Sequence, residues 1–353
     1  MNNMNVIKSP DPHSIELNNR LSFSNGEPQP SSQESIIHEI QNRMHGERDP
    51  SVRLALAIEG GGMRGVISGA MVAALEDMAI DPTVFDAIYG SSAGAVNGAY
   101  YIAGQAREGT SIYYEDITGP EFLSWQRVLK RNSPLSLEYL VQSVMRDNKP
   151  LDHSKVIDSK RLRPVATDAD HGVRYVFPAA QSQEELESQL LSSARIPMMA
   201  GKPYSHEGKR YLDGSFSEGT PWKAPQDDGF NHVLVLGTRP LGMSRETNKK
   251  STMTLAVASR FAPPGSRALI RECIATGKVM TEELHKAVLE GYYNGAKVAA
   301  ITPGSEEGLP DLFEQDKDAL IHAAKLGCRA VEDFFDVPHA TKFRTEHFFG
   351  QDA

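Results

Sequence analysis

Two short apolar segments, each followed by a glycine-rich turn and then by a helical pattern, constrain the fold more than any other part of this sequence. The first segment, residues 54–58, leads into GGGMRG at 60–65. The second, residues 85–89, leads into GSSAG at 90–94. Residues 54–58 are a continuous apolar run, which is typical of a strand buried on both faces of a parallel sheet, and 85–89 indicate a second short strand. Two such units in succession predict a doubly wound α/β fold.

The remaining patterns extend this alternation of strands and helices without an internal repeat. We expect a single catalytic core over residues 51–240, helices over 241–353 that complete the same domain, and a disordered tail over 1–50 in which 36–44 could form one short helix. Residues 105–150 mix aromatic and basic residues and predict a cap of two or three short helices. The other expected helices cover 66–78, 93–103, 184–193, 266–293 and 316–335, and the other expected strands cover 173–180, 210–212, 232–237 and 296–301.

Composition excludes several classes of function. The net charge of -9 disfavours bulk attraction to nucleic acid or to an anionic membrane, although local basic patches stay possible. Neither Cys273 nor Cys328 has a second cysteine nearby for a disulfide framework or a thiolate metal site. No apolar run approaches the roughly 18 residues of a membrane-spanning helix. We therefore expect a cytoplasmic protein without a thiolate metal site, and peripheral contact with a membrane stays open. We expect no cofactor.

The GSSAG turn predicts a nucleophilic serine. In the pattern GxSxG between a strand and a helix, the serine occupies a tight turn that pushes its hydroxyl above the edge of the sheet. Small residues must flank it, and Gly90 and Gly94 supply them around Ser92. The alternative is a structural turn in which Ser92 only caps the helix.

The GGGMRG turn is compatible with more than one use. Its glycines, Gly60 and Gly65 included, satisfy the dinucleotide pattern GxGxxG, but that use wants an acidic residue at the end of the second strand, where GSSAG stands instead. A phosphate-binding loop would need a Lys-Ser or Lys-Thr pair. The remaining use is an oxyanion hole built from converging backbone amides, in which Arg64 gives electrostatic or structural support.

The base for the serine is less evident than the serine itself. No histidine follows a strand in a distinctive position: His232 opens a strand, and His206 lies in a polar loop. Asp213 ends a short strand, and Gly214 allows a sharp turn after it, so a two-residue Ser–Asp unit competes with a Ser–His–Asp triad and with an ordinary structural turn.

Together these residues resemble the patatin-like phospholipase family. The resemblance runs from about residue 53 to 240 and includes GGGMRG, GSSAG and the Asp213-Gly214 pair, together with SSARIP at 192–197 and ATDADHG at 166–172, in the family's order and spacing. Two positions depart from it: Ser215 follows the Asp-Gly pair, where Gly or Ala is common, and Glu59 precedes the glycines.

The resemblance implies a three-layer α/β/α fold with a mostly parallel sheet and a lipid acyl hydrolase that cleaves phospholipids, galactolipids or glycerides without an obligatory metal. It assigns Ser92 as nucleophile and Asp213 as proton acceptor. It assigns the oxyanion hole to the backbone of Gly61, Gly62, Met63 and Arg64. The competing hypotheses are a Ser–His–Asp esterase of the α/β-hydrolase class, a nucleotide-binding module that uses GGGMRG, and a lipid-binding protein without turnover.

Overall fold

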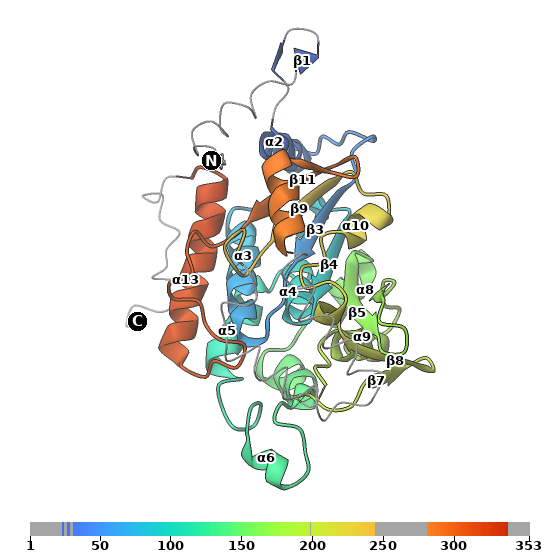
Figure 1. Cartoon of the computed structure of the whole chain (residues 1–353), viewed down its shortest axis with the longest axis vertical. Helices are drawn as coiled ribbons and strands as arrows, with labels where there is room; N and C mark the ends of the chain where they lie inside the picture. The colour runs from blue at the N-terminus through green and yellow to red at the C-terminus, as the bar shows by residue number, and fades with distance from the viewer. Residues whose placement is uncertain (1–22, 25–26, 29–30, 198, 244–280, 338–353) are drawn as a thin grey trace, which may run out of the picture.

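A mixed, mostly parallel β-sheet forms the centre of the molecule (Figure 1). The computed structural model describes residues 23–24, 27–28, 31–197, 199–243 and 281–337. Within them the strand order of the large sheet is β10-β11-β9-β3-β4-β5-β8-β7, and β6 pairs with β5. The strands of the large sheet are β3 (Leu54–Ile58), β4 (Ala87–Ser91), β5 (Leu162–Asp168), β6 (Arg174–Val176), β7 (Tyr204–His206), β8 (Lys209–Asp213), β9 (His232–Leu236), β10 (Tyr292–Tyr293) and β11 (Ala296–Ile301). A separate pair consists of β1 (Phe23–Ser24) and β2 (Glu27–Pro28).

The parallel core of the sheet explains the apolar runs in the sequence. β11, β9, β3, β4 and β5 run parallel, so their carboxyl ends meet at one edge. On β3, the side chains of Leu54, Leu56 and Ile58 belong to one hydrophobic cluster, and Ala55 and Ala57 belong to clusters on the other face. Both faces of β3 are therefore buried, as its continuous apolar pattern predicts.

Helices cover both faces and make the predicted three-layer α/β/α arrangement (Figure 1). The larger layer contains α3, α4, α5 and α13, and the most extensive contact among them is between α3 and α13. On the opposite face, the helical residues 281–290 and α10 pack on the sheet. The helices and helical turns are α2 (Ser32–Met44), η1 (Gly62–Gly65), α3 (Val66–Asp77), η2 (Pro82–Val84), α4 (Ala93–Ile102), α5 (Ala106–Glu115), α6 (Gln126–Leu129), α7 (Leu137–Tyr139), η3 (Leu140–Asn148), α8 (His153–Ser159), α9 (Gln183–Ser193), η4 (Gly214–Phe216), α10 (Ala224–Asp227) and α13 (Lys317–Phe334).

The expected disordered tail over residues 1–50 is wrong for its last part. Residues 32–44 form α2, whose first turn has a capping box between Ser31 and Glu34. Ile36 and Ile40 are completely buried against the core, so this helix is an integral part of the domain. The sequence allowed a short helix at 36–44 but did not indicate that it begins at Ser32 or packs against the core, because the two isoleucines lie in a segment that is otherwise polar. Residues 1–22 of the expected tail lie outside the described residues.

The buried guanidinium of Arg43 fixes α2 to the amino-terminal edge of the sheet. It donates to Glu39 at 2.5 Å and to Asp86 at 2.9 Å, and also to the carbonyl oxygens of Val84 and Val52.

Breaking a buried ion pair by removing one partner leaves the other charge without compensation. We therefore expect Arg43→Met to lower the free energy of unfolding by about 3–5 kcal/mol, measured by urea denaturation. Arg210→Met, which removes an exposed ion pair with Asp170, is the control and should cost less than about 1 kcal/mol.

Three other expectations differ from the structure. Strand β5 was absent from the expected elements, although it lies between β4 and β8. The strand expected over 173–180 is limited to β6, at 174–176. The helix expected over 266–293 is observed for 281–290 and gives way to β10 at Tyr292, while its first part, 266–280, lies outside the described residues. Among the described helices, none combines the length and the apolar composition needed to cross a bilayer.

Candidate active site

The two glycine-rich turns lie side by side at the carboxyl edge of the sheet. GGGMRG follows β3, and GSSAG spans the end of β4 and the start of α4. The two strands are neighbours, with Ile58 opposite Gly90. Ser92 is the residue between β4 and α4, and its backbone has φ 56° and ψ −126°. A positive φ is uncommon for a residue other than glycine and marks a strained backbone of the kind found at nucleophile elbows.

Close packing explains why the elbow needs small residues. A Cβ on Gly90 would come within 2.5 Å of the Ala95 backbone, and one on Gly94 would clash with the carbonyl oxygen of Ile58. A Cβ on Gly60 would clash with the Ser91 carbonyl and lie 2.9 Å from the Ser92 Cβ. The glycine loop therefore packs directly against the elbow, because neither side carries a side chain that would separate them.

Backbone geometry determines which amides of the glycine loop can face an anion. Gly61 and Gly62 have φ of 139° and 57°, which an L side chain rarely adopts. The Met63 N–H donates to the Leu312 carbonyl at 3.0 Å, and the Arg64 N–H donates to the Gly61 carbonyl at 3.2 Å. Of the four amides assigned to an oxyanion hole, these two have protein acceptors in this conformation. The Gly61 and Gly62 amides have no acceptor among the described residues and are the better candidates.

The Arg64 side chain packs against the glycine loop. Its side chain is buried, and its Nε donates to the Thr238 hydroxyl at 3.3 Å. A Cβ on Gly61 would lie 3.1 Å from the Arg64 Nη2, so the guanidinium packs against the turn at Gly61. This geometry favours the structural role that the sequence left open, and the cation remains close enough to act on a charge at the loop.

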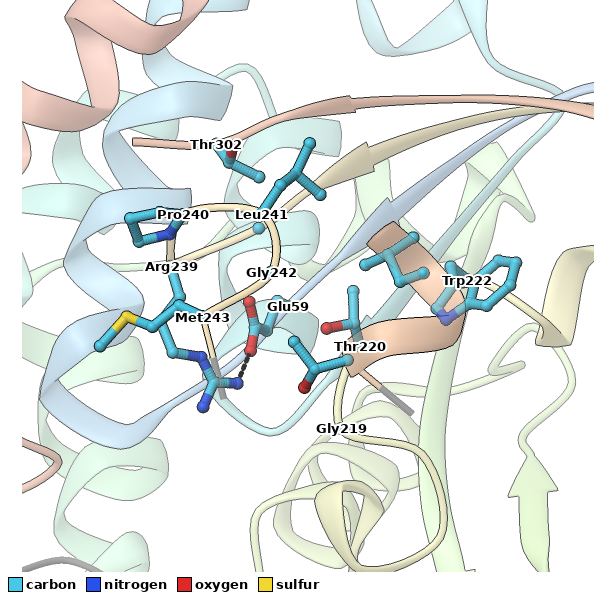
Figure 2. A pocket seen from close by; sticks show the side chains of 13 residues that line it. Glu59, Gly219, Thr220, Trp222, Arg239, Pro240, Leu241, Gly242, Met243 and Thr302 are labelled. Atoms are coloured by element: carbon cyan, nitrogen blue, oxygen red, sulfur yellow. Dashed lines mark hydrogen bonds and ion pairs between the residues drawn. The ribbon is translucent and has the colours of Figure 1, made fainter. Parts of the chain in front are cut away.

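A buried carboxylate, Glu59, joins the glycine loop to the segment after β9 (Figure 2). One of its oxygens accepts the Thr238 N–H at 2.7 Å, and the other pairs with the Arg239 guanidinium. The Thr238 hydroxyl in turn donates to the Gly60 carbonyl at 3.3 Å. A cavity of about 40 Å³ adjoins this group and is lined by Glu59, Arg239 and Trp222 among others. The sequence singled out Glu59 as unusual but gave no sign of its partners.

Asp213 reaches the same edge from the antiparallel part of the sheet. It ends β8 opposite Ala166 of β5, and the neighbouring Val165 lies opposite Ser91 of β4. Its carboxylate is buried, and Oδ1 accepts the Ser215 N–H at 2.8 Å. A Cβ on Gly214 would lie 2.5 Å from the Ser91 hydroxyl. The Asp213-Gly214 turn thus packs against the elbow, and only β5 separates the strands that carry the two predicted catalytic residues.

The segment Ser193–Arg195 fixes both candidate residues through hydrogen bonds. The Ser193 hydroxyl accepts the Ser92 N–H at 2.9 Å and donates to the Val165 carbonyl at 2.6 Å. The Arg195 carbonyl accepts the Asp213 N–H at 3.0 Å. Sequence reasoning noted SSARIP without giving it a role. Its position across the end of the expected helix 184–193, with Pro197 closing the segment, was the available signal.

Neither histidine considered as an alternative base lies beside the elbow. His232 begins β9 and pairs with Leu54 at the start of β3, which puts it at the opposite edge of the sheet from Ser92. Burial lowers the pKa of His232 to about 4. His206 bonds to the Ser188 hydroxyl at 2.8 Å and lies opposite Lys209 of β8. Lys209 is four residues before Asp213 on that strand, which is a distance of about 13 Å along the backbone. The described residues contain no group of three or more His, Cys, Asp or Glu side chains that could hold a metal ion.

Comparison with known proteins adds a family to this geometry. Residues 56–225 match the model of a family described as patatin-like phospholipase. The uncharacterized protein YjjU of Escherichia coli (strain K12) is 27% identical over 196 residues, 54% of this chain and 53% of YjjU, so the chain spans about half the length of this relative. The structure of VipD from Legionella pneumophila aligns with a TM-score of 0.44 and 11% identity over 81% of this chain and 67% of VipD. The family match covers all three turns at the carboxyl edge.

Proposed function

We propose that this chain, whose residues 56–225 are a patatin-like phospholipase domain, is a lipid acyl hydrolase with Ser92 as nucleophile and Asp213 as proton acceptor. The observation that carries the proposal is the convergence of three turns: Gly60 packs against Ser92, and Gly214 packs against Ser91. The site combines a serine with positive φ, a loop whose Gly61 and Gly62 amides have no acceptor within the described residues, and a buried carboxylate. These correspond to the nucleophile, the oxyanion donors and the base that acyl transfer to a hydroxyl requires.

In the first half of the reaction, the Ser92 Oγ attacks the carbonyl carbon of the ester, and its proton passes to the Asp213 carboxylate. The tetrahedral intermediate carries its negative charge on the former carbonyl oxygen. The Gly61 and Gly62 amides donate to that oxygen, and each donor of this kind contributes roughly 3 kcal/mol in the transition state. Collapse breaks the bond to the alcohol or lysolipid, which takes the proton from Asp213 and departs.

The second half regenerates the enzyme. Water attacks the acyl-serine ester and gives one proton to Asp213, and the same amides stabilise the new oxyanion. Collapse releases the fatty acid, and the proton returns to the Ser92 oxygen. A single carboxylate therefore serves as base and then as acid in each half, which removes the need for a histidine.

Covalent labelling tests the assignment of the nucleophile. A fluorophosphonate probe should label the wild-type protein once, and Ser92→Ala should abolish the label. Cleavage after Arg64 and Arg107 by trypsin gives a single peptide, residues 65–107, in which fragment ions distinguish Ser92 from Ser91 and Ser68. Ser111→Ala, a change at an ordinary helix position, is the control and should label normally. A label on any other residue, or none on the wild-type protein under conditions that preserve its fold, would contradict the proposal.

A further inference from the structure

The short helix α6 carries a group of exposed apolar side chains at one end of the molecule. Figure 1 shows α6 at the lower end, away from the central sheet. Trp125, Val128 and Leu129 are 55%, 50% and 87% exposed. The other exposed large apolar side chains among the described residues are Met44 and Val173, each alone in its segment, and the pair Leu289 and Tyr292. Residues 125–131 form the tip of this end of the molecule.

The tip is held in place at its base. A β-bridge joins Leu123 to Leu135 on either side of it. The Arg127 guanidinium donates to the carbonyl oxygens of Phe122 at 3.1 Å, Pro134 at 3.4 Å and Glu121. These bonds close the loop, so the apolar side chains are presented outward without much further loss of conformational entropy on binding.

The charge on the tip favours one class of partner. Lys130 and Arg131 directly follow the exposed Leu129 and are themselves exposed. They stand on a chain whose net charge is -9, so the tip is a local basic surface on an acidic protein. Tryptophan and leucine beside lysine and arginine are the side chains that enter the interface of a bilayer with anionic headgroups. Tryptophan and arginine are also common at protein–protein interfaces, although lysine is depleted there, so a protein partner is the alternative that the test must separate.

The base of the tip is connected to the candidate active site. Gln315 donates to the Thr118 carbonyl at 2.8 Å, and three residues earlier the Leu312 carbonyl accepts the Met63 N–H of the glycine loop. A cavity of about 400 Å³ at the base is lined by Arg127 and Arg195, and the Arg195 carbonyl holds the Asp213 backbone. A membrane engaged by the tip would therefore lie at the same end of the molecule as the three turns.

We propose that the tip docks the protein on anionic lipid surfaces by inserting Trp125, Val128 and Leu129 while Lys130 and Arg131 contact the headgroups. The proposal rests on the proposed function for its purpose, because an acyl hydrolase of lipids must reach its substrate in a bilayer. Its test measures binding, so it stands or falls separately from catalysis.

The two tryptophans of the chain make a direct test. Trp125 is exposed, whereas Trp222 is 1% exposed and packs against Tyr293. Full-length Ser92→Ala protein, which should leave the lipid intact, is mixed with phosphatidylcholine vesicles that contain or lack phosphatidylglycerol. We expect a blue shift of the emission and quenching by brominated acyl chains, both stronger with phosphatidylglycerol. Trp125→Phe should remove both signals.

Matched variants distinguish insertion of the tip from non-specific adsorption of the protein to vesicles. Leu129→Ser should weaken partitioning into phosphatidylglycerol vesicles by about tenfold or more, whereas Leu289→Ser, at another exposed leucine, should not change it. Lys130→Gln and Arg131→Gln should each weaken it by about fivefold, and only on anionic vesicles. Equal partitioning of the two leucine variants would overturn the proposal. An emission spectrum that does not change when vesicles are added would also overturn it, and this second result is what a tip that binds a protein predicts.

Hydrolysis of a soluble short-chain ester by the tip variants of the otherwise wild-type protein completes the design. We expect this activity to be unchanged, since the ester needs no membrane. If no ester is hydrolysed by the wild-type protein but Trp125 still reports insertion, the proposed function fails and the docking surface stands. If the ester is hydrolysed normally but Trp125 reports no insertion, the docking surface fails and the proposed function stands.

Discussion

Ser92→Ala, Asp213→Asn and the double variant are expected to lower kcat for ester hydrolysis by the same factor, about 10⁴-fold or more. The proposed mechanism needs the hydroxyl and the carboxylate to act as one unit, and the residues of such a unit are strongly non-additive. Without the serine there is no nucleophile, and without the carboxylate the serine keeps its proton. Steady-state kinetics on p-nitrophenyl esters, together with product profiling on phospholipid vesicles, measure the effect.

Asparagine is the informative replacement at position 213 because it preserves the turn. Its amide oxygen can still accept the Ser215 N–H, which Oδ1 of Asp213 accepts at 2.8 Å. Asp168→Asn is the matched control: it ends the neighbouring strand β5, and its carboxylate also accepts backbone N–H bonds, from Asp170 and His171. Losses that add in the double variant, or an Asp168 variant as inactive as the Asp213 variant, would refute the two-residue unit.

The sequence predicted the parts of the fold that depend on local pattern. β3 and α4 fall at or within one residue of their expected bounds, because an apolar strand and a helix of small residues each have a clear period. β5 escaped because its sequence contains Arg163 and Pro164, and proline disfavours a central strand. The structure accommodates Pro164 because its carbonyl oxygen still accepts the Phe177 N–H, and the antiparallel strands pair with β5 only beyond it.

The sequence predicted only those candidate site residues that lie in a turn with its own local signal. Ser92 and Asp213 each sit in a turn whose glycine marks it in the sequence. The partners that hold these turns come from distant segments: Leu312 meets the glycine loop, and Ser193 meets the elbow. Nothing in a local pattern encodes such pairings, since they depend on which loops the sheet topology brings to the same edge.

One of these distant partnerships leads to the second large effect: Glu59→Gln is expected to lower kcat by about 100-fold and to leave KM within about twofold. Glu59 pairs with Arg239 (Figure 2) and accepts the Thr238 N–H at 2.7 Å. Thr238 in turn bonds to both the Gly60 carbonyl and Arg64. An oxyanion hole acts only when its donors are held within about 0.5 Å of the productive geometry. Loss of the charge loosens that support without touching the substrate.

Because a buried ion pair also contributes to stability, the variant needs a control that breaks an equivalent pair elsewhere. Glu39→Gln removes the carboxylate paired with the buried Arg43 at the opposite edge of the sheet. Both variants should lower the melting temperature, since each removes a buried carboxylate from its ion pair with an arginine. Only the Glu59 variant should lower kcat, and it should also react more slowly with the fluorophosphonate, whose phosphoryl oxygen occupies the same hole. If Glu39→Gln reduced kcat as much as Glu59→Gln does, the effect would be one of global stability, and Glu59 would have no specific part in positioning the glycine loop.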